Sequence, residues 1–268
     1  MRSSRDTAPA LSAPSRYARR RMSGDDTTIG RVLTRRRALA LLGAGGIAGL
    51  AGARLLAPKS ARAQGAAAPG VCVARPALTE GPYFVDVKLD RSDIRSDPAD
   101  GTRRPGAPLR ITLRVSRLAG GTCASLPGAV VDVWHCDAAG AYSGVADRGG
   151  STVGHAFLRG FQTTDAGGLV AFTTIYPGAY PGRAVHVHFK VRAAAGPGRA
   201  HELTSQLFFD DELTDRVHAR PPYAAASARR MRNERDGIFR QAKGQLTLPV
   251  APSGEGYAGA FDLALEVG

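Results

Sequence analysis

Short strand-like runs, separated by glycine, proline and aspartate, recur along the chain from residue 109 onward. Leu109–Val115 alternates strictly between apolar and polar residues, which is typical of a strand with one buried face. Ala129–His135 is almost continuously apolar, as expected of a strand buried on both faces. Further candidate strands are Gly168–Thr173, Val185–Val191, Ser205–Phe209 and Phe261–Val267. Short strands at this spacing predict an all-β fold: a β-sandwich of mainly antiparallel strands, with long loops and little helix.

The best helix candidate is Ala224–Gln241, although its apolar pattern is irregular. The acidic run Asp210-Asp211-Glu212 is interpreted as a solvated turn. Pro-Gly pairs mark turns inside Ile175–Ala184, so this segment is predicted to be a loop between two strands. Loops on a rigid β-scaffold are common places for catalytic and binding residues.

Residues 1–63 have the character of an export leader. A twin arginine, Arg35-Arg36, precedes a weakly apolar, Gly- and Ala-rich run over Ala38–Ala57, and Ala61-Arg62-Ala63 fits a signal-peptidase site. An uncleaved membrane anchor is the alternative, because the run is about as long as a spanning helix. We expect a cleaved leader over 1–63 and one β-sandwich domain over 64–268. The twin-arginine machinery would then export the protein to the periplasm or the medium, with no stable membrane anchor after cleavage.

The net charge of +13 suggests at first a nucleic-acid-binding protein, but its distribution argues against one. Residues 1–63 hold 13 of the 36 lysines and arginines and 3 of the 23 acidic residues, which leaves 23 basic and 20 acidic residues elsewhere. The remaining +3 is too small for a basic binding face, so no nucleic-acid partner is expected.

Three cysteines in an exported chain predict one disulfide and one spare thiol. Cys72 and Cys123 both flank strands near the start of the domain, so we expect them to pair. Cys136 belongs to the buried strand region and is expected to stay reduced, although it could replace either partner.

The sharpest chemical feature is His186-Val187-His188 in a predicted strand. Side chains alternate along a strand, so the two imidazoles share one face and could bind one metal ion. A His-x-His pair alone is weak evidence, because exposed strand histidines are common.

Two tyrosines strengthen the metal hypothesis. Tyr180 lies in the tight loop that leads into the histidine strand, and Tyr142 lies in a turn after the buried strand. Phenolate is a hard anionic donor that needs a strong Lewis acid such as Fe(III) to lose its proton near neutral pH. Two phenolates and one hydroxide would neutralise Fe(III), as a buried site requires. For each tyrosine alone, packing beside a loop is the simpler interpretation.

These segments together resemble the intradiol ring-cleavage dioxygenases, a family that includes catechol 1,2- and protocatechuate 3,4-dioxygenases. The resemblance is carried by Pro127–Gly144, with its Tyr142-Ser143-Gly144 turn, by Phe157–Asp165 and by Ile175–Phe189. It extends from about Leu78 to Phe209 and more loosely to the C-terminus. It implies a β-sandwich and a non-haem Fe(III) enzyme that cleaves the ring of a catechol with O2 to a cis,cis-muconate.

The resemblance also implies roles for individual residues. Four would bind the iron, namely Tyr142, Tyr180, His186 and His188. Tyr180 would leave the iron when substrate chelates and would act as a base, and Arg183 would face the substrate ring. Gln206 is similar to a glutamine that supports the site. Tyr83 and Tyr176 are candidate substrate-binding residues, with packing as the alternative for both.

Two other functions stay open. The chain could be an exported β-sandwich module that binds a metal or ligand without turnover, or a copper or zinc carrier that uses the His-x-His strand. The complete set of metal-binding residues with Arg183 favours the enzyme, and a red-brown colour would exclude zinc. The sequence leaves open which small aromatic diol is the substrate and whether the protein forms a homo-oligomer.

Overall fold

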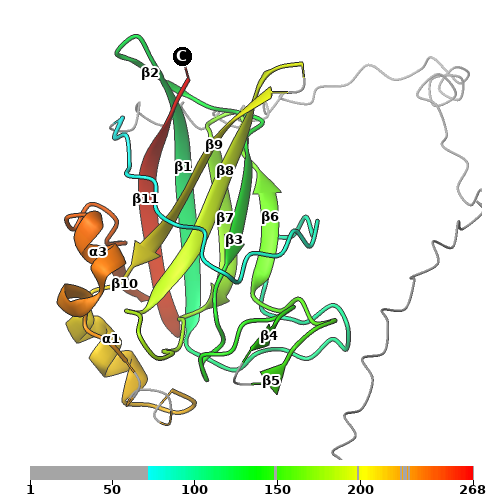
Figure 1. The fold of residues 1–268 in the computed structure, drawn as a ribbon, viewed down its shortest axis with the longest axis vertical. Coiled ribbons are helices and arrows are strands. Elements are labelled where there is room, and N and C mark those ends of the chain that lie inside the picture. Colours follow the sequence, from blue (N-terminus) through cyan, green and yellow to red (C-terminus); the bar gives the residue numbers. More distant parts are fainter. Residues whose placement is uncertain are drawn as a thin grey trace, which may run out of the picture. The chain divides into compact units, whose positions relative to one another are not determined.

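The computed structural model describes residues 72–147, 150–197, 199–223, 225, 228 and 230–267 (Figure 1). The expected leader over 1–63, and residues 64–71 that follow it, lie outside the described residues. Among the helices that are described, none has the length and apolar character needed to cross a membrane.

Two β-sheets face each other around a shared core (Figure 1). The first contains β1 (Pro108–Ala119), β2 (Thr122–Ser125), β7 (Leu169–Ile175), β10 (Val250–Ser253) and β11 (Gly256–Glu266). The second has the order β6 (Arg159–Thr163), β3 (Val130–Trp134), β8 (His186–Gly196), β9 (Arg199–Phe208). A small hairpin of β4 (Ala146–Asp147) and β5 (Gly150–Ser151) stands apart from both. The predicted β-sandwich is therefore confirmed.

The alternation seen in the sequence explains how the strands face the core. Leu109, Ile111, Leu113 and Val115 of β1 are all buried in the core, as alternate residues of a one-sided strand should be. Most neighbouring strands are antiparallel, but β1 and β11 run parallel, with Leu109 opposite Tyr257. The last strand of the domain thus lies between β10 and β1.

The helix prediction over Ala224–Gln241 is confirmed only in part, because the described residues form short separate helical pieces rather than one helix. Among the residues of this range that the structure describes, residues 230–232 are not helical, whereas Asn233–Arg235 form a 3-10 turn, η1, and Gly237–Gln241 form the short helix α3. The acidic run is not a solvated turn, because it begins helix α1 (Asp211–His218). The Asp210 carboxylate caps α1 by accepting a hydrogen bond from the Leu213 amide at 2.8 Å.

The expected disulfide between Cys72 and Cys123 is present. It ties the start of the described chain to strand β2. Cys136 lies outside the disulfide, buried, and its thiol donates to the Gly178 carbonyl.

Candidate metal centre

Strand β8 presents two histidines on the face that points away from the sandwich core. Val187, Phe189 and Val191 fill the core, so His186 and His188 lie on the opposite face. Their Nε2 atoms are 3.0 Å apart. Both rings are almost fully buried, at 2% and 1% exposure. The two nitrogens therefore converge on one point that water does not reach freely.

The protonation of these rings leaves electron pairs for a cation. His186 Nδ1 donates to the Ala184 carbonyl at 2.7 Å, which leaves the Nε2 lone pair pointing at His188. Burial, helped by the positive charge of Arg183, lowers the pKa of His186 to about 3. Burial likewise holds the pKa of His188 well below its usual value. Two neutral imidazoles whose nitrogens face each other at this distance form a natural metal-binding pair.

Cross-strand neighbours hold His188 in place. Trp134 of β3 and Gln206 of β9 lie directly opposite His188 in the two flanking strands. The Trp134 ring stacks on the His188 ring, with centroids 4.9 Å apart and planes 8° from parallel. Trp134 thus forms a wall of the site.

Two tyrosines from separate loops complete the group. The Tyr180 hydroxyl lies 3.2 Å from His186 Nε2, and the Tyr142 ring lies 5.6 Å from the Tyr180 ring between centroids. The Tyr142 hydroxyl is buried; its polar neighbour is the Tyr180 hydroxyl, and it makes no well-formed hydrogen bond to any described residue. An orphaned buried hydroxyl is costly, so this oxygen fits a ligand atom better than a packing role. Burial raises the pKa of both phenols, so only a strong Lewis acid would ionise them.

Two glycines let the tyrosine loops touch. A side chain on Gly140 would place its Cβ 2.3 Å from the Ala179 carbonyl oxygen, and one on Gly178 would lie 2.4 Å from the Ala138 oxygen. Gly140 also has φ of +89°, which favours glycine. The close contact of the two backbones sets the spacing of Tyr142 and Tyr180.

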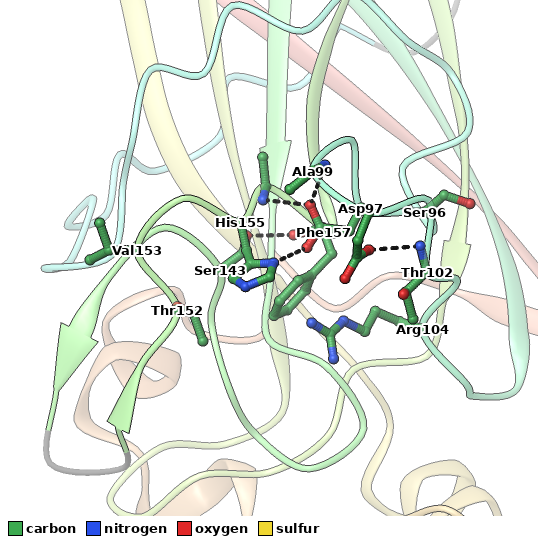
Figure 2. Close-up of polar contacts among 12 residues, drawn as sticks. Ser96, Asp97, Ala99, Thr102, Arg104, Ser143, Thr152, Val153, His155 and Phe157 are labelled. Carbon is green, nitrogen blue, oxygen red and sulfur yellow. Dashed lines mark hydrogen bonds and ion pairs between the residues drawn. The ribbon is translucent and has the colours of Figure 1, made fainter.

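Hydrogen bonds to a neighbouring loop fix the turn after Tyr142. Thr152 Oγ1 donates to the Tyr142 carbonyl and Ser143 Oγ to the Phe157 carbonyl, both at 2.6 Å. The buried Arg159 guanidinium donates to Ser143, from Nε to Oγ at 2.9 Å. Figure 2 shows the loop that supplies Thr152 and Phe157 beside this turn.

Asp97 contacts His155 and so anchors that same loop (Figure 2), and Asp100 lies close to both. Their potential ligand atoms lie within 4.8 Å of one another. However, Asp97 Oδ2 is paired with His155 Nδ1 at 2.6 Å, and Asp97 Oδ1 accepts from the Ala99 and Ala156 amides. The carboxylate is already satisfied by protein groups, so we interpret this group as a structural brace.

Arg183 lies beside the histidines. Its Nη1 is 3.5 Å from His186 Nε2, and its Nη2 donates to Gln206 Oε1 at 2.5 Å. Gln206 in turn donates to the Thr79 carbonyl at 2.8 Å. The third contact of Arg183 is an ion pair with Asp236 at 2.9 Å, a residue that the sequence did not single out. Asp236 lies 53 residues away, so no local pattern signals the pair.

An open cavity of about 780 Å³ adjoins the site. Tyr83, Tyr142 and Tyr180 line it, and the Tyr83 ring stacks on Tyr142 with centroids 4.6 Å apart. Tyr176 does not line this cavity. It is fully buried in the core, and its hydroxyl forms a hydrogen bond with Thr214 Oγ1 at 2.7 Å. The proposed substrate contact for Tyr176 is therefore wrong, and its packing alternative fits the structure.

The candidate centre thus combines two imidazole nitrogens, two phenol oxygens, a guanidinium and an adjoining cavity. The donors come from β8, from the turn after β3 and from the loop before β8. The structure brings together all four residues expected to bind metal, with Arg183 and Gln206 beside them. Tyr83 lies on the cavity side.

Comparison with known proteins gives a consistent result. A family model, Dioxygenase_C, described as Dioxygenase, matches residues 79–234. A chlorocatechol 1,2-dioxygenase of Pseudomonas sp. (strain P51) is 32% identical in an alignment of 154 residues that covers 51% of this chain. The chain spans 55% of the length of that relative.

Solved structures extend the match. The intradiol ring-cleavage dioxygenase of Tetranychus urticae is 33% identical, with a TM-score of 0.63. The match covers 73% of this chain and 95% of that one. The dioxygenase domain of a dioxygenase carbohydrate-binding protein fusion from Streptomyces sp. SirexAA-E is also 33% identical, with a TM-score of 0.52. That match covers 73% of this chain and all of the domain (100%).

Proposed function

Since the chain belongs to the intradiol ring-cleavage dioxygenase family, we propose that it is a non-haem Fe(III) enzyme that cleaves a catechol-type ring with O2. The carbon–carbon bond between the two hydroxylated carbons breaks, and so does the O–O bond. Each of these carbons becomes a carboxyl carbon, so both atoms of O2 enter a cis,cis-muconate-type diacid. The ring is oxidised by four electrons and O2 is reduced by four, so no further reductant is needed.

The observation that carries the proposal is the convergence of His186, His188, Tyr180 and the orphaned hydroxyl of Tyr142. This N2O2 set fits Fe(III), because two phenolates cancel two of its three charges and a hydroxide would cancel the third. Zinc sites more often use cysteine, histidine or carboxylate. When bound, Fe(III) would supply Lewis acidity toward both catechol oxygens and draw electron density from the ring, which opens a ring carbon to O2.

The surrounding residues have separate tasks in this proposal. Tyr180 is only partly buried and lines the cavity, whereas Tyr142 is almost fully buried. Tyr180 is therefore the phenol with room to move, and its oxygen accepts a proton from the incoming catechol. Arg183 holds a positive charge near the ring carbon on which negative charge develops. Gln206 accepts a hydrogen bond from Arg183 and so limits its rotation.

The cavity suits a small aromatic diol. Tyr83 offers a ring face stacked on Tyr142, and small residues such as Ala139, Gly140 and Ala141 leave room beside it. Arg183 and Tyr83 would therefore contact the substrate from two sides. A role in the breakdown of aromatic compounds follows from this substrate class.

The test is oxygen uptake by iron-loaded protein against a panel of catechols, hydroxyquinols and protocatechuate, with product identification. One mole of O2 per mole of diol and a ring-opened diacid would support the proposal. Loss of the diol to an extradiol product, or binding without any oxygen uptake, would contradict it. The second outcome would make a non-catalytic binding module the better reading.

We also propose that the twin-arginine leader exports the protein after it has folded. The support is the Arg35-Arg36 pair, the weakly apolar run and the small residues before Gln64. Changing both arginines to lysine keeps the charge but removes the guanidinium groups. The double variant should stay in the cytoplasm, and export at the normal level would refute the assignment.

A further inference from the structure

The carboxylate of Asp236 lies behind Arg183 and is almost completely buried, at 1% exposure. Its Oδ2 accepts from Arg183 Nε at 2.9 Å and from the Ala184 amide at 2.8 Å. Its Oδ1 accepts from the Ile238 amide at 2.8 Å and the Phe239 amide at 3.3 Å. Four hydrogen bonds satisfy both oxygens, so the carboxylate has little freedom to rotate.

Arg183 is held on two edges of its planar guanidinium. Asp236 Oδ2 accepts a hydrogen bond from Nε, and Gln206 Oε1 accepts a hydrogen bond from Nη2 at 2.5 Å. The remaining Nη1 is directed at His186 Nε2, 3.5 Å away. Two fixed acceptors on different edges of a rigid fork determine its plane and its direction. The Arg183 side chain is 17% exposed, so only a small part of it is accessible to solvent or to a ligand.

The charge of Asp236 also matters for Arg183. Burial alone would raise the pKa of Asp236, but the Ala184 amide and the Arg183 cation outweigh burial and hold that pKa below its usual value. Asp236 is thus ionised, and it compensates a positive charge that otherwise lies beside two neutral, buried imidazoles. Removing the carboxylate would leave Arg183 unpaired on that edge.

We propose that Asp236 is a positioning residue for the ring-cleavage reaction. Asp236 fixes the Arg183 guanidinium beside the proposed metal site. It also links the orientation of that guanidinium to the folding of the segment around α3. The inference rests on the proposed function. It assigns a task to a residue that lies beyond the 79–234 stretch matched by the family model. A helix cap that served stability alone would not need its second oxygen on Arg183.

The variant Asp236→Asn removes the charge and one acceptor with almost no change in size. Asp210→Asn is the matched control, because Asp210 caps α1 by the same contact, to the Leu213 amide at 2.8 Å, and makes no described contact with Arg183. Both variants should lower the unfolding midpoint. Only Asp236→Asn should lower kcat, by about 10- to 100-fold, as loss of a supporting contact at a metal site commonly does. Iron content and the visible band should stay near the wild type.

A double-mutant cycle shows whether Asp236 acts through Arg183. The variants are Asp236→Asn, Arg183→Ala and both together. If Asp236 works by orienting Arg183, the double variant should be no slower than Arg183→Ala alone. Fully additive losses in kcat would overturn the proposal. If Asp236→Asn does not fold, the cycle uses Asp236→Glu instead. This variant keeps the negative charge but moves the carboxylate away from its present position.

The same cycle is measured without turnover, by anaerobic titration of the iron-loaded proteins with 4-nitrocatechol. The dissociation constants of the single and double variants are compared. Non-additive effects of the substitutions at 183 and 236 on 4-nitrocatechol binding support the positioning role, even though no reaction takes place. Wild-type protein that turns over no catechol would sink the proposed function. Independent, uncoupled effects of the two substitutions on 4-nitrocatechol binding would sink the role of Asp236, so the two failures are distinct.

Discussion

Gly140 offers a direct test of how the two tyrosine loops build the candidate metal centre. In Gly140→Ala the new Cβ would lie 2.3 Å from the Ala179 oxygen, whereas unstrained contacts need more than 3 Å. The loops must therefore separate by about 1 Å. Tyr180 follows Ala179 directly, so its hydroxyl would move away from His186 Nε2, now at 3.2 Å.

The expected loss has two parts. An alanine at φ of +89° costs roughly 1–2 kcal/mol in backbone strain. The clash adds roughly 1–3 kcal/mol, as overpacking usually does. In a domain of this size, the clash alone would lower the melting temperature by about 2–12 °C. Iron affinity should fall by about 10- to 100-fold, because the ligands are no longer preorganised.

Gly182→Ala is the matched control. Gly182 lies in the loop of Tyr180 with φ of +85°, but a Cβ there would meet nothing within 4 Å. It carries the backbone strain without the clash. Iron titration followed at the visible band, together with thermal unfolding, compares the two variants. Equal iron affinity in Gly140→Ala and Gly182→Ala would refute the claim that this backbone contact sets the tyrosine spacing.

Three further outcomes are expected. Tyr142→Phe should bleach or shift the visible band of the iron-loaded protein, and an unchanged spectrum would remove Tyr142 from the ligands. Replacing Cys72 and Cys123 by serine should cost about 4 kcal/mol by the loop-entropy model, since the bridge spans 51 residues, and denaturant unfolding with and without reductant measures this. Burial lowers the pKa of His135 to about 4, below an unfolded value of 6.5. The unfolded chain therefore binds more protons between these pH values, and the contribution of His135 to the stability of the metal-free protein should fall by about 3 kcal/mol as pH drops from 6.5 to 4. A His135→Gln variant whose stability has the same pH slope would contradict this.

Local pattern predicted the longer strands and the shared face of the two histidines, whereas the resemblance to a known family was needed to assign ligand roles to Tyr142 and Tyr180. Leu109–Val115 alternates because one face of β1 meets the core, and His186 and His188 share a face because β8 alternates in the same way. The loop before β8 was marked by its Pro-Gly pairs. These features depend on residues close in sequence, which is why sequence alone could predict them.

The features that sequence missed depend on distant residues or on short elements. The parallel pairing of β1 with β11 joins segments about 150 residues apart, and nothing in either strand specifies that partner. Helix α1 is only eight residues long, so apolar periodicity could not reveal it. Its signal was the cap itself: Asp210 followed by two acidic residues in the first turn.

Tyr176 and Asp236 illustrate the same limit from opposite sides. Tyr176 is four residues from Tyr180 and was expected near the cavity, but the chain turns between them and buries it against Phe209. Asp236 is distant in sequence and yet contacts Arg183 directly. Proximity along the chain is a poor guide inside a loop-built site.

The position of β11 has a consequence for the order of events during synthesis. One whole edge of β1 is bare until residues 256–266 have left the ribosome, because β11 is the strand that pairs there. Meanwhile β8 and the tyrosine loops, which come earlier in the chain, have no finished opposing sheet to pack on. The sheet that contains β1 therefore cannot be completed until β11 has been synthesised, and the core between the two sheets closes only then.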